Sequence, residues 1–168
     1  MVLWMILFIL SIALLLISII LIVINRPIDK ISIKESLDLC NLAVITLTNN
    51  GHRFNFMLDT GAVECLISKS ALKLMEWSDL KQTINANGFN GKVELCPGAV
   101  TNLSYKGKVF SAELFMSKSL DKTFSEIKAH TGVQLHGIIG NEFLKKYGYI
   151  LDFDKLEVYT KRKWRMKL

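Results

Sequence analysis

The stretch "FMLDTGAVECLIS", residues 56–68, decides the fold of this chain. It places Asp59 directly after the apolar residues 56–58, and the small residues Thr60, Gly61 and Ala62 follow it. A carboxylate that is buried without a partner costs several kcal/mol, so burial at this point predicts a hydrogen bond, a charge partner or a proton for Asp59. The stretch therefore identifies Asp59 as the candidate chemical group.

The residues before Asp59 predict a β-hairpin. The segments "LAVITLT" (42–48) and "HRFNFMLD" (52–59) are rich in β-branched and aromatic residues, and the "NNG" between them is a tight-turn signal. The face of the second strand that we expect to pack on the core consists of Phe54, Phe56 and Leu58. The intervening residues, Asn55 among them, are expected on the opposite face, and the strand is expected to end at Asp59.

The rest of the chain predicts a mostly β fold with short helices. The expected elements are a short strand at 64–68, a short helix within 68–77 capped by Ser68 or Ser70, hairpins turning at Gly88 to Gly91 and at Gly107, a weak helix or turn at 125–132, a short strand at 137–140, a helical turn at 141–147, and two strands around "DFDKL" (152–156). We find no internal repeat and no low-complexity segment. With 168 residues in all, one globular domain is expected.

The N-terminal residues predict a membrane anchor. Residues 2–24 carry no charge, and about 23 residues of helix span roughly 35 Å, enough for a bilayer core of about 30 Å. A cleaved signal peptide fits less well, because its apolar core is shorter and a basic segment precedes it. The predicted organisation is a transmembrane anchor at 1–24, a juxtamembrane stalk at 25–40, a globular domain at 41–160 and a basic tail at 161–168.

The basic residues favour a single-pass protein whose domain faces the cytoplasm. Arg26, Lys30 and Lys34 follow the apolar stretch and nothing basic precedes it, and the tail "KRKWRMKL" (161–168) would be attracted to an anionic bilayer. A periplasmic or other extracytoplasmic domain stays open. The excess charge lies in these two segments, so no nucleic-acid partner is expected, although a basic membrane-surface or nucleic-acid-binding protein is a third alternative.

The cysteines and histidines predict neither disulfides nor a metal site. Cys40, Cys65 and Cys96 are odd in number and none forms a C-x-x-C pair, so reduced thiols are expected. Their spacing to the histidines matches no zinc motif, and neither a metal nor another cofactor is predicted.

Three features together resemble the retropepsins, the retroviral-type aspartic peptidases. They are "FMLDTGA" (56–62) after a hairpin, a glycine-bearing hairpin in the middle, and "GIIGNEFL" (137–144) before a terminal strand pair, and the resemblance covers Leu42 to Tyr159. It implies a single acid-protease lobe, a homodimer and a polypeptide substrate. It also implies that Asp59 and its symmetry mate share a proton, activate a water and protonate the leaving nitrogen, with no covalent intermediate.

The resemblance also assigns roles to other residues. By this resemblance, the active-site loop is supported by Thr60, Gly61 and Ala62. The flap that closes over the substrate would consist of Gly88, Phe89, Asn90 and Gly91. An ordinary exposed hairpin is an equal alternative for these residues. The core strand beneath the site would consist of Gly137, Ile138, Ile139 and Gly140.

The chain departs from the family pattern at three places. Asn141 and Glu142 stand where retroviral enzymes usually carry an Arg that supports the dimer, and the segment from Glu94 to Met116 is longer than a minimal flap return. Ala62 stands where pepsin-like enzymes usually carry a Ser, and the loss of that donor implies a higher carboxyl pKa and a working pH closer to neutral. These departures leave open a rival interpretation, in which the domain no longer cleaves and serves as a membrane-tethered dimerisation or peptide-binding module.

Overall fold

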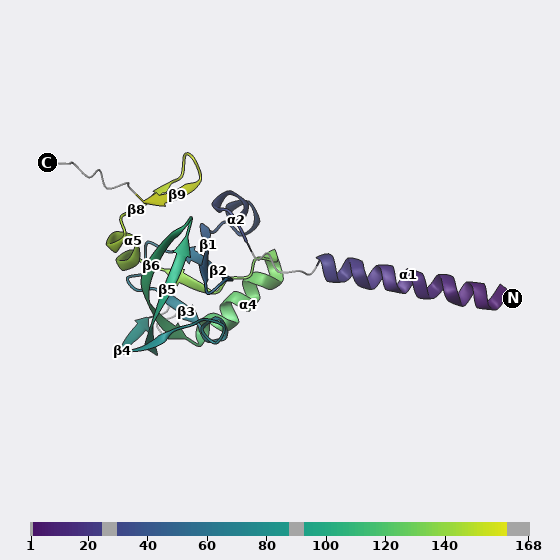
Figure 1. Ribbon diagram of the computed structural model, residues 1–168, viewed down its shortest axis with the longest axis horizontal. Helices are drawn as coiled ribbons and strands as arrows, with labels where there is room; N and C mark the ends of the chain where they lie inside the picture. The colour runs from purple at the N-terminus through teal and green to yellow at the C-terminus, as the bar shows by residue number, and fades with distance from the viewer. Residues whose placement is uncertain (1, 25–29, 88–92, 161–168) are drawn as a thin grey trace.

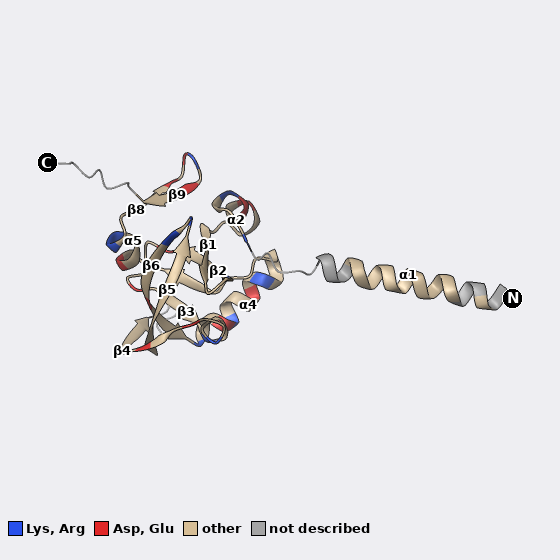
Figure 2. Ribbon diagram, viewed as in Figure 1, with Lys and Arg blue, Asp and Glu red and all other residues tan. Residues whose placement is uncertain are grey.

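The computed structural model describes residues 2–24, 30–87 and 93–160, and for residues 2, 3, 5–7 and 21–24 it describes the backbone only. Helix α1, Val2–Ile24, carries no charged residue, whereas acidic and basic residues are interspersed along the ribbon of the β domain (Figure 2). Within the described residues, no helix has both the length and the apolar character of a membrane span. The anchor at 1–24 therefore stays a prediction, and the basic tail at 161–168 lies outside the described residues.

Seven strands of the described residues form one curled sheet (Figure 1). The strands are β1 (Val44–Asn49), β2 (His52–Leu58), β3 (Leu66–Ser68), β4 (Ser78–Asn87), β5 (Val93–Tyr105), β6 (Lys108–Ser117) and β7 (Gly137–Ile139). Their order is β1-β2-β7-β3-β6-β5-β4, and β1 also pairs with β5 through Thr48 and Ser104. This extra pairing curls the sheet back on itself. The mostly β fold expected from the sequence is confirmed.

The predicted hairpin is present as β1 and β2. Asn50 and Gly51 turn the chain with φ of 44° and 82°, which matches the turn chemistry of the sequence. The expectation of one buried face was incomplete, because Asn55 is fully buried together with Phe54 and Phe56. The side chain of Asn55 donates to the backbone carbonyl of Gln134 at 2.9 Å, so its polar atoms find partners beneath the segment that follows α4.

Residues 30–40 do not form the stalk that the sequence predicts. Helix α2, Ile33–Cys40, starts with a capping box between Ser32 and Glu35. Ile33 and Ser36 are buried, and the Ser36 hydroxyl accepts a hydrogen bond from the backbone N–H of Val44 at 3.0 Å. The domain therefore begins before Asn41, and α2 is part of it.

Two other helices differ in length from the sequence prediction. Helix α3, Lys69–Leu72, is capped by Ser68 as predicted but ends early, because the backbone N–H of Glu76 is bound by the side chain of Asn49 at 2.8 Å. Helix α4, Ser119–Thr131, is longer than the weak helix expected at 125–132 and ends at Gly132 with φ of 74°. Its buried face comprises Leu120 and Phe124.

The last described residues form a short helix and two strands, as the sequence predicts. Helix α5, Asn141–Lys146, is followed by β8, Tyr149–Asp152, and β9, Glu157–Thr160, which pair with each other in a separate two-stranded sheet. Helix α4 lies on one side of the curled sheet, and α5 with the β8–β9 hairpin lies on another (Figure 1). Apolar residues accordingly gather in two clusters, one between the sheet, α5 and β9, and one beneath α4.

Candidate active site

Asp59 lies in a tight turn directly after β2. Its backbone N–H donates to the carbonyl of Ile139 at 3.1 Å, and its side-chain Oδ1 accepts from the N–H of Gly61 at 2.8 Å. The N–H of Ala62 closes the turn on the Asp59 carbonyl at 3.2 Å. The carboxylate is half-buried in the single chain, not fully buried, because β2 ends at Leu58 and the chain then turns toward the surface. It does gain the hydrogen bond that the sequence predicts for it.

Strand β7 lies directly beside the strand that carries Asp59. It pairs in parallel with β2, with Ile139 opposite Leu58, and antiparallel with β3, with Gly137 opposite Ile67. All of its residues and Gly140 are buried. The segment 137–140 thus fills the space between the two strands that enter and leave the Asp59 turn.

Gly140 has no room for a side chain. A Cβ atom there would lie 2.3 Å from the backbone oxygen of Glu64, and a Cβ at Gly137 would lie 2.5 Å from the backbone oxygen of Leu66. Both distances are shorter than real Cβ contacts, so the close packing of backbone on backbone requires glycine at both positions. This agrees with the small residues expected beneath the loop, while the functional role of the segment stays a prediction.

The first residues of α5 hold the loop from below. The backbone N–H of Asn141 donates to the carbonyl of Ala62 at 2.8 Å, and that of Glu142 donates to the carbonyl of Val63 at 3.0 Å. The Asn141 side-chain amide donates to the carbonyl of Thr60. Sequence reasoning noted Asn141 only as a departure from the family pattern and missed this contact, which joins residues 81 positions apart.

Cys65 is a buried thiol at the base of the loop. Its Sγ accepts from the N–H of Gly140 at 3.4 Å, and burial raises its pKa to about 12. Such a thiol stays protonated at neutral pH and is a poor nucleophile. Cys40 and Cys96 are also free thiols. Across the described ranges, no group of three or more His, Cys, Asp or Glu residues could hold a metal ion.

The predicted flap, Gly88 to Gly91, lies outside the described residues. The strands on either side of it are described: β4 and β5 pair antiparallel, and Asn87 is opposite Val93. The added length between Glu94 and Met116 is taken up by the long β5–β6 hairpin, which turns at Lys106 and Gly107 as predicted.

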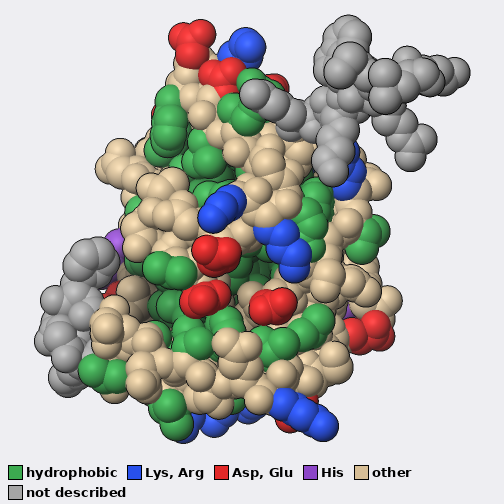
Figure 3. All heavy atoms as spheres, turned by 90° about the vertical axis from the view of Figure 1, so that its left-hand side faces the viewer, with side chains coloured by type: hydrophobic (Ala, Val, Ile, Leu, Met, Phe, Trp, Pro, Cys, Tyr) green, Lys and Arg blue, Asp and Glu red, His purple; other side chains and the backbone are tan. Residues whose placement is uncertain are grey.

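A shallow, mainly apolar hollow adjoins the loop, on the side of the molecule where α5 and β8 lie. Its lining comprises Thr60, Val63, Asn141, Glu142, Leu144, Lys145, Gly148, Tyr149 and Leu151. Figure 3 faces this side of the molecule and shows hydrophobic side chains gathered in its hollows, with acidic and basic side chains among them. The Asp59 turn is therefore flanked by an apolar surface at which Val63 is 62% exposed.

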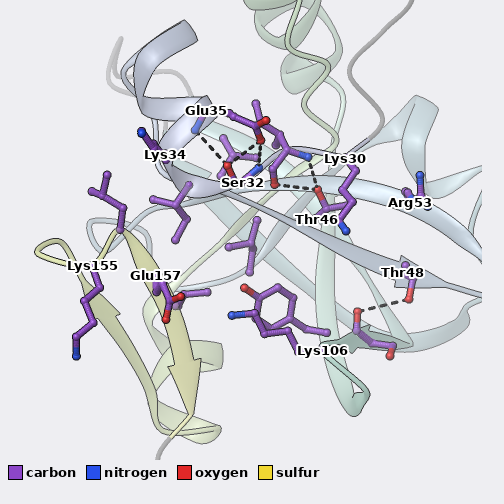
Figure 4. Close-up of a pocket in the computed structure, with 18 of the residues that line it drawn as sticks. Lys30, Ser32, Lys34, Glu35, Thr46, Thr48, Arg53, Lys106, Lys155 and Glu157 are labelled. Carbon is purple, nitrogen blue, oxygen red and sulfur yellow. Dashed lines mark hydrogen bonds between the residues drawn. The ribbon is translucent and has the colours of Figure 1, made fainter.

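A second, wider hollow lies elsewhere and includes no residue of the Asp59 turn. It is bounded by the start of α2, by β1, by the β5–β6 turn and by the turn into β9 (Figure 4). Basic residues such as Lys30 and Lys106 share its lining with acidic ones such as Glu157, and Glu35 is already bound to Ser32. Its mixed charge favours no class of ligand, and its position separates it from the candidate site.

Comparison with known proteins identifies the class to which this fold and loop belong. The sequence model of the family described as "gag-polyprotein putative aspartyl protease" matches residues 45–146, which is more than half of the chain, and the chain belongs to that family. The matched segment contains the Asp59 turn, β7 and the whole of α5. The domain is therefore a retropepsin-like aspartic protease domain.

Among solved structures, the chain is similar to the retroviral protease-like domain of Ddi1 from Leishmania major. The two share 15% sequence identity with a TM-score of 0.48, over 71% of this chain and 86% of that chain. No curated protein matches the chain.

Proposed function

We propose that this chain is an aspartic endopeptidase that acts as a homodimer. The observation that carries the proposal is the Asp59 turn: a single carboxylate at the end of β2, fixed by the N–H of Gly61 and held from below by Ile139 and Asn141. A single chain supplies one such carboxylate. Since this chemistry needs two carboxylates that share a proton, a second copy related by a two-fold axis completes the site.

In the proposed reaction the two Asp59 carboxylates have different protonation states. The ionised one removes a proton from a water held between them, and the water oxygen bonds to the peptide carbonyl carbon. The protonated one then gives its proton to the peptide nitrogen as the C–N bond breaks. The hydrogen bond from the Gly61 N–H to Oδ1 of Asp59 fixes the orientation of the carboxylate in the turn. No covalent intermediate and no cofactor takes part.

The proposed substrate is a polypeptide in extended form. The apolar hollow beside the loop, which includes Val63 and Leu151, would be available to apolar side chains of the substrate or to the partner chain. Cleavage is tested by incubating the purified full-length chain in detergent with a diverse peptide library across a range of pH, with products identified by mass spectrometry. Cleavage that a pepstatin-type inhibitor suppresses would support the proposal. Binding of peptides without cleavage would instead favour the rival, a retropepsin-like binding or dimerisation module.

We also propose that residues 2–24 anchor the protein in a bilayer with its domain in the cytoplasm. The support is the sequence, because 23 uncharged residues precede the first basic ones. Tethering two copies in one plane would raise their effective concentration and favour the dimer. Extraction of membranes with alkaline carbonate tests the anchor. Fusions to alkaline phosphatase and to a cytoplasmic fluorescent reporter at Leu168 test the orientation, and an active phosphatase with a dark fluorescent reporter would reverse it.

A further inference from the structure

Helix α4 is capped by a residue from a distant strand. Its N-cap residue, Lys118, provides no side-chain cap, and the carboxylate of Glu94 on β5 takes that place. One oxygen of Glu94 accepts from the backbone N–H of Lys118 at 2.6 Å. The other accepts from the hydroxyls of Ser117 at 2.7 Å and Ser119 at 2.8 Å, with the backbone N–H of Ser119 at 3.4 Å.

The charge of Glu94 suits this position. Partial burial raises its pKa, but the hydrogen bonds from Ser117, Ser119 and the two backbone N–H groups outweigh that effect and leave the pKa below its usual value. The side chain is therefore ionised at neutral pH. A carboxylate at the start of a helix also interacts favourably with the helix dipole. The first turn of α4 is thus fixed to β5 by charge-assisted hydrogen bonds.

The same turn of α4 is fixed to the segment that leaves the Asp59 turn. Asp121 accepts hydrogen bonds from the backbone N–H of Ser70 at 3.1 Å and from its hydroxyl at 2.6 Å. Ser70 lies in α3, which directly follows β3, and β3 begins just after Cys65. The start of α4 therefore connects the β4–β5 hairpin, through Glu94, with helix α3, through Asp121, and α3 directly follows the strand that leaves the Asp59 turn.

We infer that Glu94 is a positioning residue, which holds the β4–β5 hairpin in place relative to the Asp59 turn by way of the first turn of α4. The inference rests on the proposed function, in which the described strands of the β4–β5 hairpin would border the substrate beside the Asp59 turn. Glu94 does not contact the reacting atoms. Its removal should therefore weaken substrate binding and leave the chemical step nearly unchanged.

The connection itself is tested without any substrate. Amide hydrogen exchange is measured on the full-length chain in detergent for the wild type, Glu94→Ala, Glu94→Gln and Glu113→Ala, a control that removes an exposed glutamate from the neighbouring strand β6. We expect exchange at Lys118, at Ser119 and in β5 to rise about tenfold or more in Glu94→Ala, less in Glu94→Gln and not in the control. Unchanged exchange in Glu94→Ala would overturn the inference.

The positioning role is tested by measuring KM and kcat separately for peptide cleavage by the wild type and the Glu94 variants. We expect Glu94→Ala to raise KM about tenfold while kcat stays within about twofold, with Glu94→Gln between it and the wild type. A merely structural role would lower the fraction of folded enzyme, so kcat would fall at constant KM, and that result would overturn the inference. A wild-type chain that cleaves nothing would refute the proposed function instead, and the exchange experiment would then decide the connection alone.

Discussion

The side-chain amide of Asn141 donates a hydrogen bond to the backbone carbonyl of Thr60, the residue directly after Asp59. The backbone N–H of Asn141 binds the carbonyl of Ala62 at 2.8 Å, so one residue holds the turn at two points. By resemblance, this is where an Arg that supports the dimer is expected. Here the side chain at 141 instead contacts the loop of the same chain.

Replacement of Asn141 by Ala should loosen the Asp59 turn without unfolding the domain. The backbone contact to Ala62 remains, whereas the contact to Thr60 is lost, so we expect the free energy of unfolding to fall by about 1 kcal/mol and kcat/KM by about tenfold. Chemical denaturation and peptide cleavage measure the two effects. Glu142→Ala is the matched control, because the hydrogen bond from Glu142 to the loop is donated by its backbone N–H, which the substitution keeps. Equal losses in both variants would contradict the role of the Asn141 side chain.

Replacement of Asp59 by Asn should abolish cleavage and preserve the fold. The Asn side-chain oxygen can still accept from the N–H of Gly61, so the turn persists, but a neutral amide cannot act as a base. Asp79→Asn is a close control, since Oδ1 of Asp79 accepts from the N–H of Lys81 at 2.9 Å, a similar two-residue contact at a bulge in β4 outside the Asp59 turn. We expect full cleavage by Asp79→Asn and a loss of at least about 10³-fold in Asp59→Asn. Activity in the Asp59 variant would remove that residue from the mechanism.

The parts of the fold that the sequence predicted correctly depend on neighbouring residues. Asn50 and Gly51 favour positive φ whatever surrounds them, and the alternation of Phe54, Phe56 and Leu58 is a local signal for a strand. The Asp59 turn could be predicted for the same reason. Its hydrogen bond to Gly61 spans two residues, and only its degree of burial was misjudged.

The parts that the sequence could not predict depend on residues far along the chain. The start of α4 was missed because its cap comes from Glu94, 24 residues before Lys118. The end of α3 is set by Asn49, which lies 27 positions before Glu76. The burial of Asn55 depends on the carbonyl of Gln134, 79 positions later. Polar contacts of this kind follow from the fold and leave no local periodic signal.

Removal of α2 should destabilise the domain. A chain that begins at Asn41 lacks the buried Ile33 and the Ser36 hydroxyl that binds the N–H of Val44. We expect it to unfold at lower denaturant than a chain that begins at Lys30. In the full-length chain Ser36→Ala should cost about 1–3 kcal/mol, because a buried N–H loses its acceptor. Asp38→Ala, on the exposed face of α2, is the control. Equal stability of the two truncated chains would restore the stalk interpretation.

Cys65 should make stability fall at alkaline pH. Burial raises the pKa of its thiol from 9.0 to about 12 in the folded chain. Above about pH 9 the unfolded chain loses this proton and the folded chain keeps it, so the folded state loses up to about 1.4 kcal/mol per pH unit until about pH 12. Denaturation from pH 8 to 10.5 should therefore show a steeper decline for the wild type than for Cys65→Ser. Cys40→Ser, at a half-buried position, should behave like the wild type. A pH-independent difference between wild type and Cys65→Ser would contradict this expectation.

The proposed dimer makes a prediction about mixed chains. A heterodimer of wild-type and Asp59→Asn chains contains one ionisable carboxylate and cannot share a proton between two, so it should be inactive. Random exchange of subunits at a ninefold excess of the variant leaves about one tenth of the wild-type chains in active dimers. Cleavage per wild-type chain should fall to about that level, and the loss should appear in kcat and not in KM, because the remaining sites are intact.

Two controls separate this mechanism from competition for substrate. In the first control, the Asp79→Asn chain is added to the wild-type chain at the same ninefold excess. Total cleavage should rise, since the variant dimers and the mixed dimers keep both Asp59 carboxylates. Dilution of the wild type in detergent should lower its specific activity as dimers dissociate, and coexpression in one membrane should oppose that loss if residues 2–24 hold both chains in one plane. Cleavage per wild-type chain that stays constant in the Asp59→Asn mixture and on dilution, with sedimentation showing only monomer, would refute the paired-carboxylate mechanism. In that case the single Asp59 turn, fixed as it is by Gly61, Ile139 and Asn141, would be better explained as part of a peptide-binding module.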